Sequence, residues 1–205
     1  MAKRPLTNPR KQASQERSRA TVDALIEATA RILVREGFDK ASTNRIAEAA
    51  GVSIGSLYQY YPSKEALVAA VIERHNRDLM QIVRAALAEV ASLPLDQAVR
   101  RIVAAAVDAH RLDPRLHRVL AEQIPRTGRL ATVDGFNREY FTLFKDYLDR
   151  HKARLRAVDL EMAAFVCVTS IEALTHTAVL HHMLSDDRVA ILVDEATRLV
   201  MRYLR

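Results

Sequence analysis

The 205-residue sequence lacks several residue types that other protein classes need. It has no Trp, one Cys, five Gly and six Pro. The single Cys167 excludes an intramolecular disulfide and suits a reducing cytoplasm. So few Gly and Pro residues predict long helices with few turns. Because no segment shows the alternation of a β-strand, we expect an all-α fold with about nine helices.

Signals for export, membrane insertion and catalysis are also missing. Residues 1–20 contain no apolar segment typical of a signal peptide. The most apolar run, 162–180, contains Glu172 and His176, which predicts a helix buried in protein rather than in lipid. Seven scattered His residues, without a zinc-binding HExxH pattern or a Gly-rich phosphate loop, give no catalytic constellation. We therefore expect a cytoplasmic protein that is not an enzyme and has no metal, no cofactor and no membrane partner.

The most informative stretch is 43–64, TNRIAEAAGVSIGSLYQYYPSK. Apolar residues at helical spacing predict a short helix over 43–50, with Thr43 as its N-cap. Gly51 is suited to end this helix, because it readily adopts the left-handed conformation. A second short helix is expected over 54–61, with Leu57 on its inner side. Two short helices joined at a tight turn predict a helix-turn-helix, whose second helix enters the DNA major groove.

These residues resemble the DNA-binding signature of TetR-family transcriptional regulators. The resemblance covers about 17–71, and Tyr61, where Phe is commoner, is a conservative departure. The matching residues are Gly37, Phe38, Thr43, Ile46, Ala47, Ala50 to Ser53, Gly55 to Tyr58, and Ser63 to Glu65. The resemblance implies a homodimeric regulator that binds double-stranded operator DNA and is released by a small-molecule effector.

Nine residues are candidates for DNA contact. Tyr58 and Lys64 match phosphate-binding residues of the family, and Thr43 matches a phosphate contact at a helix N-terminus. Arg45 can reach a base edge or a phosphate, while Gln59 can pair bidentately with adenine. The remaining candidates are Ser53 and Gly55, which lead into the second helix, and Ser56 and Tyr60, which share its outward positions with Gln59; Tyr60 can alternatively face the core, where we place Tyr61.

The charge distribution supports nucleic-acid binding. Residues 1–64 hold 11 Lys/Arg against 6 Asp/Glu, whereas residues 65–205 hold 20 against 19. The positive excess thus falls on the expected DNA-binding part, where it attracts phosphates. Residues 1–13 are expected to be a disordered basic arm, which either reaches DNA or is an ordinary frayed terminus.

The organisation follows from breaks in the helical pattern. We expect a DNA-binding domain over 14–62 and a regulatory domain over 63–205, with a long linking helix at 63–91. The other expected helices span 14–36, 95–112, 114–123, 131–154, 159–182 and 185–203.

The resemblance implies that the regulatory domain encloses an effector and that the last two helices, about 159–203, form the dimer interface. Candidate lining residues are Tyr140, Phe141, Phe144, Cys167, Ser170 and Ile171, although each can instead be plain core packing. Glu172 and His176, four residues apart, either bind a ligand or hydrogen-bond to each other inside the dimer interface, and we expect the second.

The sequence therefore predicts a ligand-released repressor of a pseudo-palindromic operator. The alternative is a DNA-binding activator, or an architectural module without a small-molecule ligand. Stabilisation by small apolar molecules would distinguish the ligand-responsive reading from the architectural one.

Overall fold

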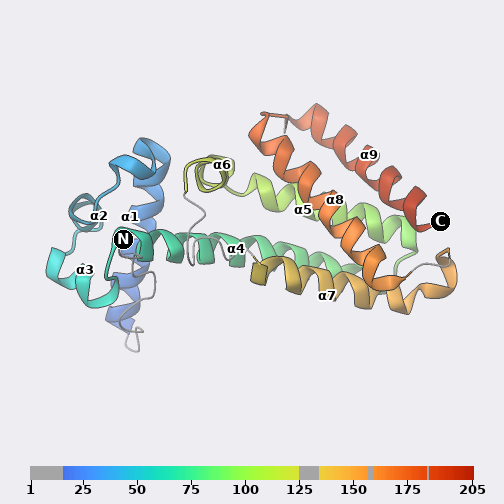
Figure 1. Cartoon of the computed structure of the whole chain (residues 1–205), viewed down its shortest axis with the longest axis horizontal. Coiled ribbons are helices and arrows are strands. Elements are labelled where there is room, and N and C mark those ends of the chain that lie inside the picture. Colours follow the sequence, from blue (N-terminus) through green and yellow to red (C-terminus); the bar gives the residue numbers. More distant parts are fainter. Residues whose placement is uncertain (1–15, 125–133, 157–158, 184) are drawn as a thin grey trace, which may run out of the picture. The chain divides into compact units, whose positions relative to one another are not determined.

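The computed structural model describes residues 16–124, 134–156, 159–183 and 185–205, and all regular elements in these ranges are helices (Figure 1). The α-helices are α1 (Glu16–Lys40), α2 (Thr43–Ala49), α3 (Ile54–Tyr60), α4 (Lys64–Glu89), α5 (Leu95–Arg111), α6 (Pro114–Glu122), α7 (Asp134–Arg150), α8 (Leu160–Leu180) and α9 (Asp186–Leu204). Two short 3₁₀ helices, η1 (Val90–Ser92) and η3 (Lys152–Arg154), follow α4 and α7. The predicted all-α class is confirmed. The predicted arm over 1–13 and the predicted helix residues 14, 15 and 131–133 lie outside the described ranges.

The chain forms two compact units, and each is assembled from two separate stretches of sequence. The first unit comprises the chain up to His75 together with the segment from Arg115 to Val133. The second comprises Asn76–Pro114 and Asp134–Arg205. Helix α4 therefore contributes its first half to one core and its second half to the other, and α6 packs within the first unit.

The core of the first unit is built from α1, α2, α3, α6 and the beginning of α4. Leu25, Ile46 and Leu57 are completely buried in it. Tyr61, predicted to join Leu57 in the core, is only 4% exposed. Residues of α6 close the same cluster, with Leu116 among its buried members. The two short helices are thus held by apolar contacts on their inner sides, which leaves their outer sides free.

The corner between α1 and α2 is fixed by contacts from α4 and from the residue that follows α6. Gly37 has φ 81° and ψ 173°, so the regular part of α1 ends there, as predicted. The next residue, Phe38, donates its backbone N–H to Gln123 Oε1 at 3.3 Å. Its carbonyl accepts a 2.9 Å hydrogen bond from Lys64 Nζ, which also lies 4.1 Å from the centre of the Phe38 ring. The corner is therefore tied to α4 and to the segment that follows α6.

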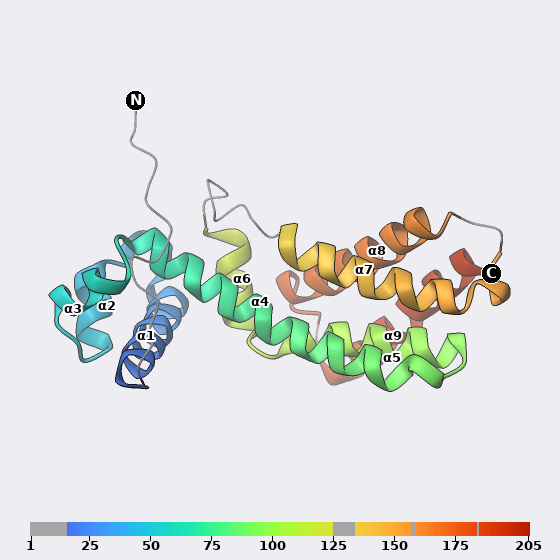
Figure 2. The same cartoon turned by 90° about the horizontal axis from the view of Figure 1, so that it is seen from below.

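The second unit packs α5 against α8 and α9, and α7 against α8 (Figures 1 and 2). The C-terminal half of α4 joins this core through Met80, Val83 and Leu87. Among the described helices, α8 has the length and apolar composition of a membrane span. Its inner residues, including Val168 and Ile171, are buried in the core, as expected for a central helix of a globular unit.

Candidate functional site

Helices α2 and α3 form the predicted helix-turn-helix around Gly51, whose φ is 68°. The N-cap of α2 is Ser42, because its backbone is extended and its hydroxyl accepts the N–H of Arg45 at 3.4 Å. The prediction that Thr43 caps this helix is therefore wrong by one residue. Ser and Thr are similarly good caps, so the sequence alone did not distinguish the neighbours.

Thr43 has a different contact, which links the two short helices. Its Oγ1 lies 3.1 Å from the hydroxyl oxygen of Tyr58. The Tyr58 side chain is 40% exposed, so its hydroxyl stands at the protein surface beside the first turn of α2. Two of the three predicted phosphate contacts, Thr43 and Tyr58, are thereby brought together in one exposed pair.

The outer side of α3 carries small and uncharged polar residues. Ser53 caps the helix by accepting the N–H of Ser56 at 3.0 Å, and the two hydroxyl oxygens are 2.8 Å apart. Gly55 is exposed, and a Cβ there would meet only the Ser53 hydroxyl, at 3.8 Å. Gln59 is exposed one turn later. This side can approach another surface closely, with the Gln59 amide as its longest polar group.

Tyr60 does not belong to this surface. Its side chain is only 7% exposed and lies in the apolar cluster with Leu57. The outward position predicted for Tyr60 is wrong, because residues three apart on a helix share a side and Leu57 faces the core.

Three basic residues around the helix-turn-helix are engaged within the protein. Arg45 forms an ion pair with Glu36, with 2.9 Å between its Nη2 and Oε1 of the carboxylate. Lys64 holds the Phe38 carbonyl, so its ammonium is partly buried rather than fully extended into solvent. Arg31, which was not among the sequence candidates, donates to the Ala49 carbonyl at the end of α2 at 3.3 Å. An Arg on α1 carries no local motif, and only the tertiary fold places it here.

The candidate effector residues meet in the core of the second unit. Tyr140, Phe144, Cys167 and Ile171 are each at most 4% exposed and belong to one apolar cluster. The other two lie at its margin: Phe141 is partly buried against this cluster, and Ser170 is half-buried. The sequence therefore identified neighbouring positions on α7 and α8.

Two polar groups in this core are neutral at physiological pH. Burial, followed by the nearby Glu172, raises the pKa of the Tyr140 phenol. Burial raises the pKa of the Cys167 thiol to about 12. The hydroxyls of Tyr140 and Tyr147 are buried without a hydrogen-bond partner among the described residues. Such groups favour a bound molecule that supplies a hydrogen bond rather than a charge.

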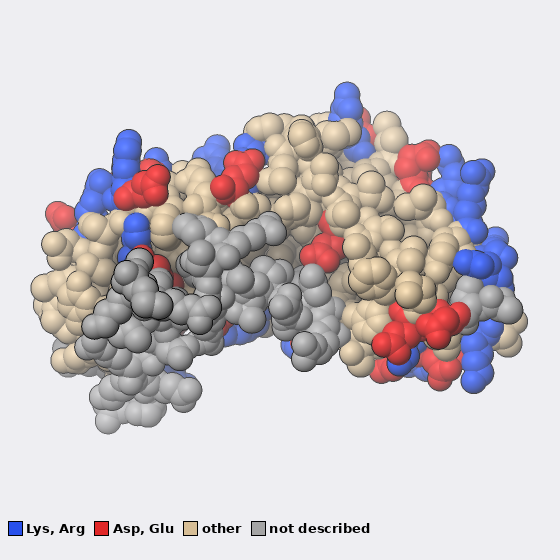
Figure 3. Space-filling view, in the orientation of Figure 1, with Lys and Arg blue, Asp and Glu red and all other residues tan. Residues whose placement is uncertain are grey.

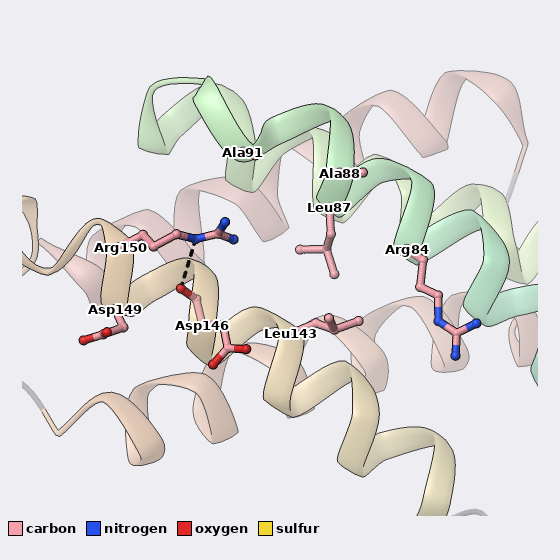
Figure 4. A pocket seen from close by; sticks show the side chains of 8 residues that line it. All are labelled: Arg84, Leu87, Ala88, Ala91, Leu143, Asp146, Asp149 and Arg150. Carbon is pink, nitrogen blue, oxygen red and sulfur yellow. Dashed lines mark hydrogen bonds between the residues drawn. The ribbon is translucent and has the colours of Figure 1, made fainter.

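A separate groove runs between α4 and α7, with a volume of about 540 Å³. Figure 4 shows Leu87 and Leu143 pointing into it from opposite helices, with Arg150 crossing one end. Arg150 donates to the Asp146 carbonyl at 3.3 Å. The groove is also lined by Arg84, Ala88, Ala91 and Asp149. None of the six predicted effector residues lines this groove. The groove lies on the side of α7 that faces α4, whereas the predicted effector residues lie on α7 and α8.

Helices α8 and α9 expose large apolar side chains. Met162 and Phe165 on α8 are 57% and 55% exposed, and Ile191 and Leu199 on α9 are 62% and 52% exposed. Exposed large apolar groups on two neighbouring helices mark a surface suited to burial against a partner.

Both units match families of bacterial regulators. Residues 25–71 match "Bacterial regulatory proteins, tetR family", and residues 94–204 match "Tetracyclin repressor-like, C-terminal domain". The nucleoid occlusion factor SlmA of Haemophilus ducreyi (strain 35000HP / ATCC 700724) is 32% identical over 116 residues, which are 57% of this chain and 55% of that protein. The transcriptional activator FasR of Mycolicibacterium smegmatis (strain ATCC 700084 / mc(2)155) is 31% identical over 144 residues, 66% of this chain and 65% of FasR. The chain thus spans between half and two thirds of these relatives.

The fold also agrees with a solved structure. FadR of Bacillus subtilis, solved in complex with stearoyl-CoA, superposes with a TM-score of 0.69 at 16% identity, covering 89% of this chain and 99% of FadR. Because the second family match covers more than half of the sequence, and the first covers the helix-turn-helix, the chain belongs to the tetR family of bacterial regulatory proteins.

Proposed function

We propose that the protein is a DNA-binding transcriptional regulator, and specifically a repressor that a small-molecule effector releases from a pseudo-palindromic operator. The observation that carries the proposal is the exposed side of the helix-turn-helix. Tyr58 pairs with Thr43 at its margin, and Gly55 and Gln59 lie exposed on α3. An uncharged, closely approachable helix with one long amide suits base contacts in a major groove.

The residues divide by the kind of contact that they can make. Thr43, Tyr58 and the α2 N-terminus are suited to phosphates, which position the protein without selecting sequence. Gln59 is suited to a base edge, and Ser53 and Ser56 flank it. Arg45 and Lys64 have internal partners, so each must exchange or share a contact to bind phosphate. Lys64→Ala would disturb the Phe38 corner as well as DNA binding, which makes Gln59 the cleaner probe.

The decisive experiment selects bound duplexes from a random library with wild type, Gln59→Ala and Gln81→Ala. Gln81 is an exposed glutamine on α4, outside the helix-turn-helix, and is the matched control. We expect Gln59→Ala to lose base preference at one position per half-site, at roughly 1–3 kcal/mol for a bidentate contact, and Gln81→Ala to select the wild-type motif. Identical motifs from all three proteins would remove Gln59 from base recognition; no motif from the wild type would reject the operator-binding function.

The effector is proposed to enter the core around Tyr140, Phe144, Cys167 and Ile171. The unpartnered hydroxyl of Tyr140 supports this position, and FadR, a protein of the same fold, was solved with a bound small molecule. A hundredfold loss of operator affinity needs about 2.8 kcal/mol of difference in effector binding between the two conformations. A thermal-shift screen of small apolar compounds, followed by operator release, tests this step.

A homodimer through α8 and α9 completes the proposal. The exposed Phe165 and Leu199 support it, because a second copy would cover such apolar groups. Two recognition helices held about 34–36 Å apart would then meet successive major grooves.

A further inference from the structure

Six basic residues gather at one end of the second unit, where α7, η3 and α9 end. Figure 3 shows Lys and Arg side chains concentrated at this end of the unit. We call the set the basic end surface; all six members are exposed, and they are Arg150, Lys152, Arg154, Arg156, Arg202 and Arg205. The count of charged residues along the sequence did not reveal this surface, because residues 65–205 are nearly neutral in total.

Specific contacts bring its two sequence segments together. The backbone N–H of Arg156 donates to the Leu204 carbonyl at 3.0 Å. The Arg156 guanidinium donates to the Tyr203 carbonyl at 2.6 Å and lies 4.8 Å from the centre of the Tyr203 ring. Residues 150–156 are thereby joined to the end of α9, so the grouping of charges is a built feature of the fold.

The charges on this surface are poorly balanced. Within the described residues, its one ion pair joins Lys152 to Asp149 at 3.6 Å. Arg150 and Arg202 lie in the last turns of their helices, where a positive charge suits the helix dipole. Arg154 is the last residue of η3 and Arg205 follows α9, and neither has a carboxylate partner among the described residues. Crowded like charges repel each other, and an anionic partner would relieve that repulsion.

The chemistry of the surface favours phosphate. Five of the six residues are Arg, whose guanidinium binds phosphate oxygens bidentately. None of the large apolar side chains that the described residues expose belongs to 150–156 or 202–205, so the surface offers no apolar anchor for a peptide or a lipid bilayer. We propose that the basic end surface binds the phosphate backbone of double-stranded DNA without sequence preference, as a second DNA contact in addition to α3.

The test uses the full chain with Tyr58→Ala and Gln59→Ala, which weaken the helix-turn-helix contact. Onto this background we add either K152Q/R154Q/R205Q or the control R77Q/R115Q/R188Q, which removes three exposed charges elsewhere. Fluorescence anisotropy then measures the affinity for a random-sequence duplex over a range of salt concentrations. The same proteins are tested on vesicles with and without anionic phospholipid, and circular dichroism verifies that each is folded.

We expect K152Q/R154Q/R205Q to lower duplex affinity by about tenfold or more at low salt and to reduce the salt slope by about 2–3, because each lost phosphate contact removes about 0.9. The control R77Q/R115Q/R188Q should change the duplex affinity and the salt slope less. Equal affinities and slopes for the two triple variants would overturn the proposal, as would binding to anionic vesicles but not to the duplex. The outcome is independent of operator recognition, since the duplex carries no operator and the α3 residues are already replaced.

Discussion

At the scale of single residues, two tyrosine hydroxyls stand out in the apolar core of the second unit. Those of Tyr140 and Tyr147 are buried without a described partner. Because a buried polar group without a hydrogen bond loses its hydration and gains nothing in return, Tyr147→Phe should raise the free energy of unfolding by about 1 kcal/mol. Urea denaturation measures the change.

Phe144→Ala is the control for this measurement, since Phe144 is completely buried and its loss should destabilise by about 3–5 kcal/mol. If Tyr147→Phe were destabilising, its hydroxyl would have to make a hydrogen bond in solution. Tyr140→Phe should also be stabilising, but it should weaken effector binding if the effector supplies the missing partner.

Buried thiol and phenol groups determine how the free energy of unfolding changes with pH above neutrality. The pKa of Cys167 is raised from 9.0 to about 12, and that of Tyr61 from 10.0 to about 12. Above pH 9 the unfolded thiol loses its proton while the folded one keeps it, so the unfolded state binds fewer protons and the free energy of unfolding falls as pH rises. We expect this loss to begin near pH 9, and these two groups to contribute no slope at neutral pH.

Urea midpoints taken from neutral pH to about pH 11 test this expectation. Cys167→Ala should show a smaller decline than wild type, because one of the buried groups with a raised pKa is gone. If the free energy of unfolding declined equally in both proteins, burial would not protect the Cys167 thiol from deprotonation. Slow reaction of native Cys167 with a thiol reagent, and fast reaction after unfolding, would provide an independent check.

At the scale of the elements, the corner after α1 depends on a backbone conformation that suits only glycine. Gly37, at φ 81° and ψ 173°, lies in a region almost restricted to Gly, and an added Cβ would stand 2.6 Å from Gln123 Oε1. Gly37→Ala should therefore lower the free energy of unfolding by about 1–3 kcal/mol. Gly55→Ala is the control, since Gly55 has ordinary helical space around it, and should be neutral or slightly stabilising.

Gly51→Ala separates the two causes of the expected destabilisation at Gly37, which are backbone strain and a steric clash with Gln123. Gly51 has φ 68° but nothing within 4 Å of an added Cβ, so it tests backbone strain without a clash. Thermal melts of the three variants should rank Gly37→Ala as the least stable. A Gly37→Ala protein as stable as wild type would show that the corner has an alternative conformation.

The sequence predicted the elements well because helix periodicity and terminators are local. The break at Gly37, the α2–α3 turn at Gly51 and the core position of Tyr61 all depend on neighbours within one or two turns. The predicted helix over 131–154 instead ends at Arg150 and is followed by a 3₁₀ turn, since no Gly or Pro marks that end.

Tertiary contacts were less accessible to prediction from sequence. The partners of Lys64 and Arg45 arise from α1, and no spacing rule connects these segments. The inward position of Tyr60 could not be settled from the sequence, because a Tyr side chain suits a core as well as an exposed helix face and Tyr61 was already assigned to the core. The groove between α4 and α7 requires two helices that are distant in sequence, so neither contains its signature alone.

At the scale of the whole molecule, the exposed apolar residues of α8 and α9 bear on assembly. Leu199 is 52% exposed in a single chain, so Leu199→Glu should leave the monomer folded while placing an unpaired charge in the proposed dimer interface. Light scattering should show a shift from dimer to monomer, and operator affinity should fall because one half-site cannot replace two.

Gln81→Glu adds the same charge on an exposed position of α4 and should leave the dimer intact. An intact Leu199→Glu dimer with full operator affinity would place the interface elsewhere. A Leu199→Glu protein that fails to fold would instead mean that the side chain is needed within its own chain.

The interleaving of the two units has a consequence for how the protein emerges from the ribosome. The first unit needs the segment that begins at Arg115, and α5 of the second unit packs against α9, which is made about 75 residues after α5. Domains generally fold as units during synthesis, but here neither core is complete when its first stretch has been made. The apolar faces of α1 to α3 therefore stay uncovered in the nascent chain until α6 has been made, and that of α5 until α9 has been made. Chaperones that hold unfolded chains would have their longest engagement with α5, and stop codons introduced before α9 should yield protein that aggregates through its incomplete second core.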